Sequence, residues 1–282
     1  MGLAVATSLS QRADWTIHIL DLNPSGPSIA SSLNATSHAC NVTDESLLAS
    51  IFKTIFTSHH RIDFVFANAS IAERANFYLP KSNTSGTDDP VLPVKGMHAL
   101  IDINLKSVIM TTYLAAHYMR LFPSAADKSI CITASCGGLY PSYYSPIYTA
   151  TKHAVVGFMR SIAPWYYHKS GIRVNAICPG VVKTNLLSSA AWKNFPESYL
   201  TPVEKIAKTV GMLVGVRDDG TGVVVEGRGC EDGSVGEVLY GKAVEISGTK
   251  HYSREAVEFA DEAMKAVMGA TNIEVLDNAL PT

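Results

Sequence analysis

The feature that most constrains the fold is a regular alternation of apolar runs with segments of helical spacing. Six stretches predict strands, at 15–23, 36–44, 61–70, 127–138, 172–180 and 241–249. Six others predict helices, at 2–12, 45–59, 96–121, 145–171, 184–215 and 253–268. This alternation predicts an α/β fold with a parallel, doubly wound sheet.

The chain shows no repeat, no low-complexity segment and no convincing linker over its 282 residues. The sequence therefore predicts a single domain that covers 1–282. Residues 2–250 form its expected core, 184–215 a substrate lid and 250–282 a C-terminal helix and tail. Residues 80–94 are the most loop-like segment, because they combine Pro, Gly, Ser and Asp without any period.

Composition excludes several classes of protein. The net charge is −2 and the basic residues are scattered, which disfavours a nucleic-acid footprint or a basic membrane patch. No apolar run has the length of a membrane helix, and no basic segment precedes the N-terminus as in a signal peptide. The five cysteines form no paired motif, which predicts reduced thiols, no metal site and a cytoplasmic location.

A tyrosine and a lysine in "YTATK" suggest proton-transfer chemistry. Tyr148 and Lys152 are four residues apart, so their side chains share one face of the predicted helix. A nearby ammonium is expected to lower the pKa of the phenol, which lets the pair move a proton to or from an alcohol oxygen. Ser135 ends a predicted strand, where ligands of such sheets bind. Each residue alone could equally be a solvated helix position or an ordinary turn serine.

Together with three further motifs, these residues resemble the short-chain dehydrogenase/reductase family over about residues 2–250. "FANAS" resembles the family's Asn-Asn-Ala-Gly turn, and Asn68 matches its second asparagine. "IDINLKSV" contains Asn104, which matches the family's helix asparagine, and "NAICPGVVKT" resembles its Pro-Gly stretch. The resemblance implies an oxidoreductase that transfers a hydride between a nicotinamide cofactor and an alcohol or ketone.

The resemblance also assigns roles to positions of this chain. The catalytic set that it implies is Ser135, Tyr148, Lys152 and Asn104, where Asn104 supports a water that relays protons to the lysine. The cofactor-binding set that it implies is Gly2, Asp21, Asn41, Val42, Asn68, Ala69, Tyr148, Lys152, Pro179, Gly180, Val182 and Thr184.

An acidic residue at the end of the second family strand indicates which cofactor is used. Asp21 would accept hydrogen bonds from the adenosine ribose and repel a 2′-phosphate, so NAD is favoured over NADP. The chain departs from the family pattern at three places. Ala67 and Ser70 replace an asparagine and a glycine of the turn, and Asn41 stands where an aspartate is usual.

The resemblance begins late in the family's first motif. Gly2 matches the last glycine of the Gly-x-x-x-Gly-x-Gly turn, so the first strand and two glycines have no counterpart. That strand lies between two others in the family, which would leave backbone groups unpaired and remove part of the pyrophosphate cradle. Either Met1 is an internal start of a longer enzyme, or the chain is genuinely short and impaired. The intact candidate residues favour the first explanation.

The segment after Thr184 is apolar and suggests a lipophilic secondary alcohol or ketone as substrate. The expected pocket residues are Leu186, Leu187, Trp192, Phe195, Tyr140, Tyr143 and Tyr144, although each could simply pack the lid. The runs "APWYYHKSGIRVNAICPG" and "GKAVEISG" most resemble hydroxyprostaglandin-dehydrogenase-like members, including fungal ones. Family members usually pair through the helices matching 96–121 and 146–169, which implies a homodimer or homotetramer. A non-catalytic oligomer partner and a non-redox use of the fold are the alternatives.

Overall fold

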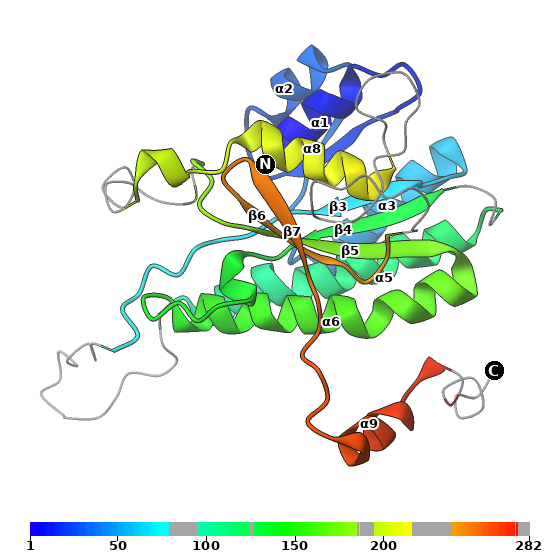
Figure 1. Ribbon diagram of the computed structural model, residues 1–282. Coiled ribbons are helices and arrows are strands. Elements are labelled where there is room, and N and C mark those ends of the chain that lie inside the picture. Colours follow the sequence, from blue (N-terminus) through cyan, green and yellow to red (C-terminus); the bar gives the residue numbers. More distant parts are fainter. Residues whose placement is uncertain are drawn as a thin grey trace, which may run out of the picture.

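The computed structural model describes residues 1–78, 95–123, 127–184, 186, 195–215, 239–273 and 275. Its centre is a five-stranded sheet in the order β3-β4-β5-β6-β7, and β1 and β2 form a second, two-stranded sheet (Figure 1). The strands are β1 His18–Asp21, β2 Thr36–Ala39, β3 Phe64–Ala67, β4 Lys128–Thr133, β5 Ile172–Pro179, β6 Ala243–Ser247 and β7 Lys250–Arg254. All described pairs are parallel except β6 with β7, so the predicted α/β fold with a mostly parallel sheet is confirmed.

Helices cover both faces of the large sheet. Helices α1 and α8 lie on one face and α5 and α6 on the other (Figure 1). The described α-helices are α1 Gly2–Ser10, α2 Gly26–Ser32, α3 Glu45–His59, α4 Met97–Ile101, α5 Ser107–Arg120, α6 Pro146–Ser170, α8 Val203–Val214 and α9 Glu262–Gly269. Two 3-10 turns span Cys136–Gly138 and Glu197–Tyr199.

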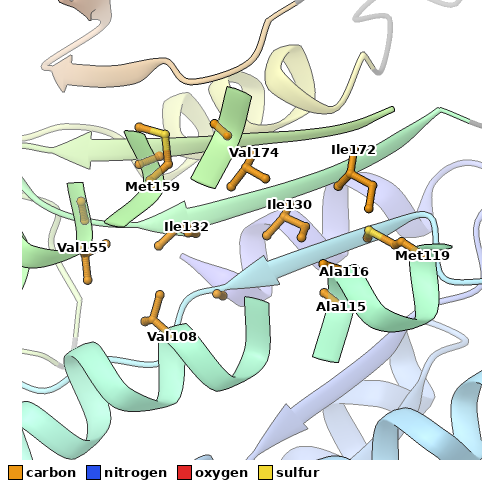
Figure 2. Packing of buried hydrophobic residues seen from close by; sticks show 14 of the residues in the cluster. Val108, Ala115, Ala116, Met119, Ile130, Ile132, Val155, Met159, Ile172 and Val174 are labelled. Carbon is orange, nitrogen blue, oxygen red and sulfur yellow. The ribbon is translucent and has the colours of Figure 1, made fainter. Parts of the chain in front are cut away.

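Strands β4 and β5 are buried along their whole length, which explains why their sequences read as continuous apolar runs. On one face their side chains pack against α5 and α6 (Figure 2). The contributors to this core include Val108, Ala115, Ala116, Met119, Ile130, Ile132, Val155, Met159, Ile172 and Val174. This packed layer is what holds α6, the helix of the candidate site, against the sheet.

Two helices begin and end where their local sequences predict. Helix α3 is capped at its start by Asp44, whose side chain accepts a hydrogen bond from the backbone N–H of Leu47 at 2.9 Å, and is followed by His60 in the left-handed conformation. Helix α6 has Pro146 in its first turn and ends at Gly171, which has a φ of 62°. Glycine adopts this conformation at little cost, so the chain can turn directly into β5.

The predicted helix at 96–121 is interrupted by a wide π-helical turn at Asp102–Lys106. The whole helical stretch Met97–Arg120 is long and apolar enough to cross a membrane by length and composition alone. A core helix of a soluble protein passes the same test, and α5 contacts β3 and β4. The turn itself places Asn104 in the interior, because a π turn shifts the residues that face the sheet.

The place of the strand without a counterpart is visible in the sheet order. Strand β1 pairs with β2 and β3 pairs with β4, but β1 and β3 do not pair with each other. Residues of both strands line one large cavity. His18 of β1 lies 3.0 Å from His38 and 3.0 Å from His59, nitrogen to nitrogen, which links the small sheet to α3. Burial, together with both neighbouring imidazoles, lowers the pKa of His18 to about 4.

The structure differs from the sequence-based expectations at two further elements. Helix α2 was not expected, because "NPSGPSIASS" is rich in turn residues and lacks a clear period. The segment expected to be a helix from 253 instead begins with the end of β7, an antiparallel edge strand joined to β6 by a tight turn at Gly248. Alternating exposure along β7 identifies it as half-buried. The loop expected at 80–94 lies outside the described residues.

The pairing of β1 only with β2 has a measurable consequence. Hydrogen exchange at the backbone amides of β1 and β2 should be at least about 100-fold faster than in β4 and β5, because strands buried between two partners open only in global unfolding. Native-state hydrogen exchange with peptide resolution measures this. Equal protection of the two sheets would show that they unfold as one unit.

Candidate active site

A cavity of about 1220 Å³ lies between β1 and β3 and runs from the carboxyl ends of the parallel strands to residues that precede these strands, among them Thr16 and Asp63. With the exception of Lys152, every residue predicted to bind the cofactor lines it: Gly2, Asp21, Asn41, Val42, Asn68, Ala69, Tyr148, Pro179, Gly180, Val182 and Thr184. Ser135 lines it too. The fold therefore brings together positions from more than 180 residues of chain at the sheet edge where ligands of doubly wound proteins bind.

Ser135 is held by the turn that follows β4. Its hydroxyl oxygen accepts a hydrogen bond from the backbone N–H of Gly137 at 3.1 Å. A side chain at Gly137 would come within 3.6 Å of both Ser135 and the ring of Tyr148, so these residues surround one small space. The same hydroxyl donates to the sulfur of Cys136 at 3.9 Å, a weak bond that a better acceptor on a ligand can replace.

Tyr148 and Lys152 lie one turn apart on α6, as their spacing predicts. The ammonium of Lys152 is 5.6 Å from the centre of the Tyr148 ring and donates a hydrogen bond to the carbonyl oxygen of Thr133 at 2.8 Å. Lys152 is fully buried, and burial lowers its pKa to about 8. It is the one predicted cofactor residue behind the cavity wall.

The expectation that the pKa of Tyr148 is lowered is wrong for the chain as it stands. Burial raises the pKa of Tyr148, and the nearby Ser135 hydroxyl lowers it only in part. The loss of water around the ring destabilises the phenolate, and the spacing of Tyr148 and Lys152 in the sequence carries no information on burial. Tyr148 is therefore a neutral phenol at pH 7.

Thr133 connects two predicted residues, Lys152 and Asn68. Its carbonyl oxygen accepts from Lys152, and its hydroxyl donates to the side-chain oxygen of Asn68 at 3.0 Å. Asn68 in turn lies against α1, because a side chain at Gly2 would come within 3.1 Å of its amide nitrogen. The end of β4 thus ties α6 to the turn after β3, although the sequence analysis gave no role to Thr133.

Asn104 has no exposed surface and is held by the turn after β3. Its side-chain oxygen accepts from the backbone N–H of Ile71 at 2.8 Å and from the Ser70 hydroxyl at 3.1 Å. Its amide nitrogen donates to the carbonyl oxygen of Ile71 at 2.9 Å. The serine that replaces the family's glycine thus makes a hydrogen bond of its own, and the predicted water relay at Asn104 stays a prediction.

The two polar residues predicted to bind adenosine sit in exposed turns at the ends of β1 and β2. Asp21 accepts a hydrogen bond from the backbone N–H of Asn23 at 2.9 Å. Asn41 accepts from the backbone N–H and the hydroxyl of Thr43 at 3.1 and 2.9 Å. These local bonds hold each side chain in place, and both residues border the cavity.

The predicted tyrosine lining of the substrate pocket is wrong. Tyr143 and Tyr144 lie in the turn before α6, are 80% and 88% exposed, and do not line the cavity. Tyr140 is turned toward β6 and donates a hydrogen bond to Glu245 at 3.0 Å. Leu186 does line the cavity. Leu187 and Trp192 lie outside the described residues, and Phe195 is 38% exposed without lining the cavity.

One further residue contacts the candidate site without having been predicted. Glu73 is 8% exposed and its carboxylate accepts a hydrogen bond from the backbone N–H of Tyr148 at 2.9 Å. The two residues are 75 positions apart, and no local pattern marks Glu73. Only the path of the chain after β3 brings it to α6.

Comparison with known proteins identifies the family. A family model described as short chain dehydrogenase matches residues 1–194. The chain belongs to the short-chain dehydrogenase family. Its members are oxidoreductases that use a nicotinamide cofactor, and this coarse activity and cofactor class therefore extend to this chain.

Curated relatives include members of the same family from a fungus. The short-chain dehydrogenase/reductase prx7 of Penicillium rubens is 48% identical, and the match covers 97% of each protein. The rat 15-hydroxyprostaglandin dehydrogenase [NAD(+)] is 31% identical over 64% of this chain and 60% of its own length. Among solved structures, one titled "ElxO with NADP Bound" has a TM-score of 0.63 at 21% identity, covering 87% of this chain and 92% of that one. At this identity the structural likeness shows the fold alone.

The residues that line the cavity of this short-chain dehydrogenase fit a nicotinamide cofactor. Helix α1 begins at the cavity, and its first N–H groups suit the phosphates. Asp21 at the end of β1 suits the ribose next to adenine, and Pro179 and Gly180 after β5 suit the nicotinamide end. The backbone of Gly2 lies so close to Asn68 that a side chain there would reach into the same space.

Proposed function

We propose that this protein is an NAD-dependent dehydrogenase that interconverts a lipophilic secondary alcohol and its ketone. The observation that carries the proposal is the convergence of Ser135, Tyr148 and the predicted cofactor residues on one cavity, with Lys152 directly behind it. The relatives that are named as NAD-dependent 15-hydroxyprostaglandin dehydrogenases support the choice of cofactor and of a lipophilic hydroxy substrate.

In the proposed reaction, Ser135 donates a hydrogen bond to the substrate oxygen and Tyr148 transfers the proton at that oxygen. A bound nicotinamide would supply the hydride acceptor in oxidation and the hydride donor in reduction. The neutral phenol of Tyr148 is ready to protonate the oxygen formed when a ketone is reduced. Alcohol oxidation needs the phenolate, so it should accelerate as the pH rises.

Lys152 and Asn104 act through their neighbours in this proposal. The pKa of Lys152 is about 8, so at pH 7 its ammonium carries the charge that stabilises a phenolate at Tyr148. Asn104 holds the turn after β3 and would anchor a relay water behind the lysine. The Leu186 side chain supplies an apolar wall for the substrate.

A titration with reduced cofactors tests the cofactor half of the proposal. NADH fluorescence should show saturable binding, and NADPH should bind about 5- to 10-fold more weakly, because the exposed Asp21 carboxylate repels the 2′-phosphate by about 1 kcal/mol in water. Asp21→Asn should reduce this preference, whereas Asp261→Asn at the start of α9 should leave it unchanged. Tighter binding of NADPH by the unmodified chain would overturn the assignment of NAD.

Turnover tests the chemical half. Incubation with NAD⁺ and a series of lipophilic secondary alcohols should form NADH, which is followed by its absorbance.

One observation favours a second candidate, a non-catalytic partner of another family member: β1 and β3 are unpaired where they face each other across the cavity. Failure of both NADH and NADPH to bind would favour that candidate.

Oligomeric state and location are part of the same proposal. Helices α5 and α6 form an outer layer, and Ile109 and Tyr113 of α5 are 38% and 63% exposed one turn apart. This stripe supports pairing of two copies, as a homodimer or as half of a homotetramer. The free thiols of Cys40, Cys131, Cys136 and Cys178 support a reducing, cytoplasmic location.

A further inference from the structure

Glu73 is a buried carboxylate that the proposed reaction does not use. One oxygen, Oε2, accepts the hydrogen bond from the backbone N–H of Tyr148. The other, Oε1, is buried and has no hydrogen-bond partner among the described residues. Burying a carboxylate with an unsatisfied oxygen costs free energy, so a position that retains one calls for an explanation.

The start of α6 lacks its own cap, and Glu73 supplies one from outside the helix. Ser145 precedes the helix, but its hydroxyl is paired with that of Ser142 at 3.0 Å and caps no backbone N–H. Pro146 has no N–H to satisfy. Glu73 thus meets the N–H of Tyr148 at the positive end of a 25-residue helix, where a carboxylate is favoured.

The same short segment also holds the other helix of the site. Ser70 and Ile71 bind the side chain of Asn104, and Glu73 follows two residues later. The turn after β3 therefore joins the π-helical turn before α5 to the first turn of α6. A shift of α6 along its axis would have to break the bond to Glu73.

We propose that Glu73 is a positioning residue: by fixing the first turn of α6 it sets the place of the Tyr148 hydroxyl relative to Ser135. This inference rests on the proposed function for its catalytic consequence but not for its structural one. The hydroxyl must approach the substrate oxygen within hydrogen-bond distance, and a misplacement of about 1 Å can cost about 100-fold in rate. Glu73 is not expected to touch substrate or cofactor, since it does not line the cavity.

Two substitutions separate the hydrogen bond from the charge. Glu73→Ala removes the acceptor, and Glu73→Gln keeps an oxygen that can accept the same bond. Asp44→Ala is the matched control, because Asp44 makes the equivalent bond at the start of α3, which carries no predicted site residue. For each variant, kcat and the KM for the alcohol are measured at saturating NAD⁺ and varied alcohol concentration. Hydrogen exchange is measured over residues 145–152.

We expect Glu73→Ala to lower kcat about 10- to 100-fold without changing NADH binding, and to accelerate exchange of the Tyr148 amide at least about 10-fold. Glu73→Gln should restore both to within about 3-fold, and Asp44→Ala should leave both unchanged. The inference is overturned if Glu73→Ala keeps kcat within twofold, or if Glu73→Gln falls as far as Glu73→Ala.

The exchange measurement keeps this test separate from that of the proposed function. If the unmodified protein forms no NADH from any alcohol, the proposed function fails while the exchange of the Tyr148 amide still decides the role of Glu73. Faster exchange in Glu73→Ala alone would then support the fixed first turn. Unchanged exchange would overturn it.

Discussion

Replacement of Tyr148 by phenylalanine is expected to lower kcat by about 10²- to 10⁴-fold, the range typical of a lost general acid or base. The substitution removes one hydroxyl from a side chain that is largely surrounded by protein, and the ring can keep its contacts with Gly137 and Lys152. Steady-state kinetics with NAD⁺ and an accepted alcohol measures the loss. Because the ring remains, NADH affinity should change by less than about twofold.

A matched control for this prediction is Tyr143→Phe. Tyr143 lies five residues earlier, is 80% exposed and does not line the cavity, so loss of its hydroxyl should leave kcat unchanged. Retention of most activity in Tyr148→Phe would refute the proposed proton transfer. An equal loss in both variants would point to a general effect on the turn before α6 instead.

Replacement of Lys152 by methionine is expected to separate activity from stability. Without the ammonium the phenolate of Tyr148 loses its nearby positive charge, and kcat should fall about 10²- to 10³-fold. Stability should not fall with it. Burial lowers the pKa of Lys152 from 10.5 to about 8, which means that the folded state disfavours the charged form.

Proton linkage determines how the buried Lys152 changes the folding stability with pH. Above pH 10.5 the amine is neutral in both states and folding carries no penalty. As the pH falls through 10.5 toward 8, the unfolded chain gains the proton first, and the folded state loses about 3 kcal/mol of relative stability. Methionine removes this penalty but also the hydrogen bond that a neutral amine would donate to Thr133, which contributes about 0.5–1.5 kcal/mol.

The net expectation for Lys152→Met at pH 7 is therefore a free energy of unfolding about 2 kcal/mol higher than that of the unmodified protein. Urea unfolding at pH 7 and pH 10 measures it, and the gain should shrink at pH 10. Lys53→Met on the exposed side of α3 is the control and should change neither activity nor stability. A loss of more than about 1 kcal/mol would mean that the ammonium stabilises the fold.

The candidate site could be predicted from the sequence to the extent that its residues stand in local patterns. Tyr148 and Lys152 share a helix face, and Ser135 and Asp21 end apolar strands. Tyr148, Ser135 and Asp21 line one cavity, and Lys152 lies behind its wall. The prediction for the tyrosines before α6 was wrong, because no local pattern indicates where their side chains point. These residues are near the site in sequence, but Tyr143 and Tyr144 are exposed to solvent.

In the fold, too, local sequence patterns predicted some features, and contacts between distant segments determined the others. Strand and helix periodicity predicted the α/β class and the helices at 45–59 and 145–171, which match α3 and α6 closely. Helix α2 was not predicted because its sequence is rich in turn residues, and strand β7 was not predicted because its five residues contain no apolar run. Which strands pair, and that β1 and β3 do not, depended on contacts between distant segments.

By itself, then, the sequence determined the secondary structure class, the order of the elements and the chemical groups available at the strand ends. These follow from backbone and side-chain preferences that act over a few residues. Only the tertiary structure decided the protonation balance at Tyr148 and Lys152, since burial sets it. It also decided that Glu73 meets Tyr148 across 75 residues, because a contact of that kind exists only once the sheet has brought the two segments together.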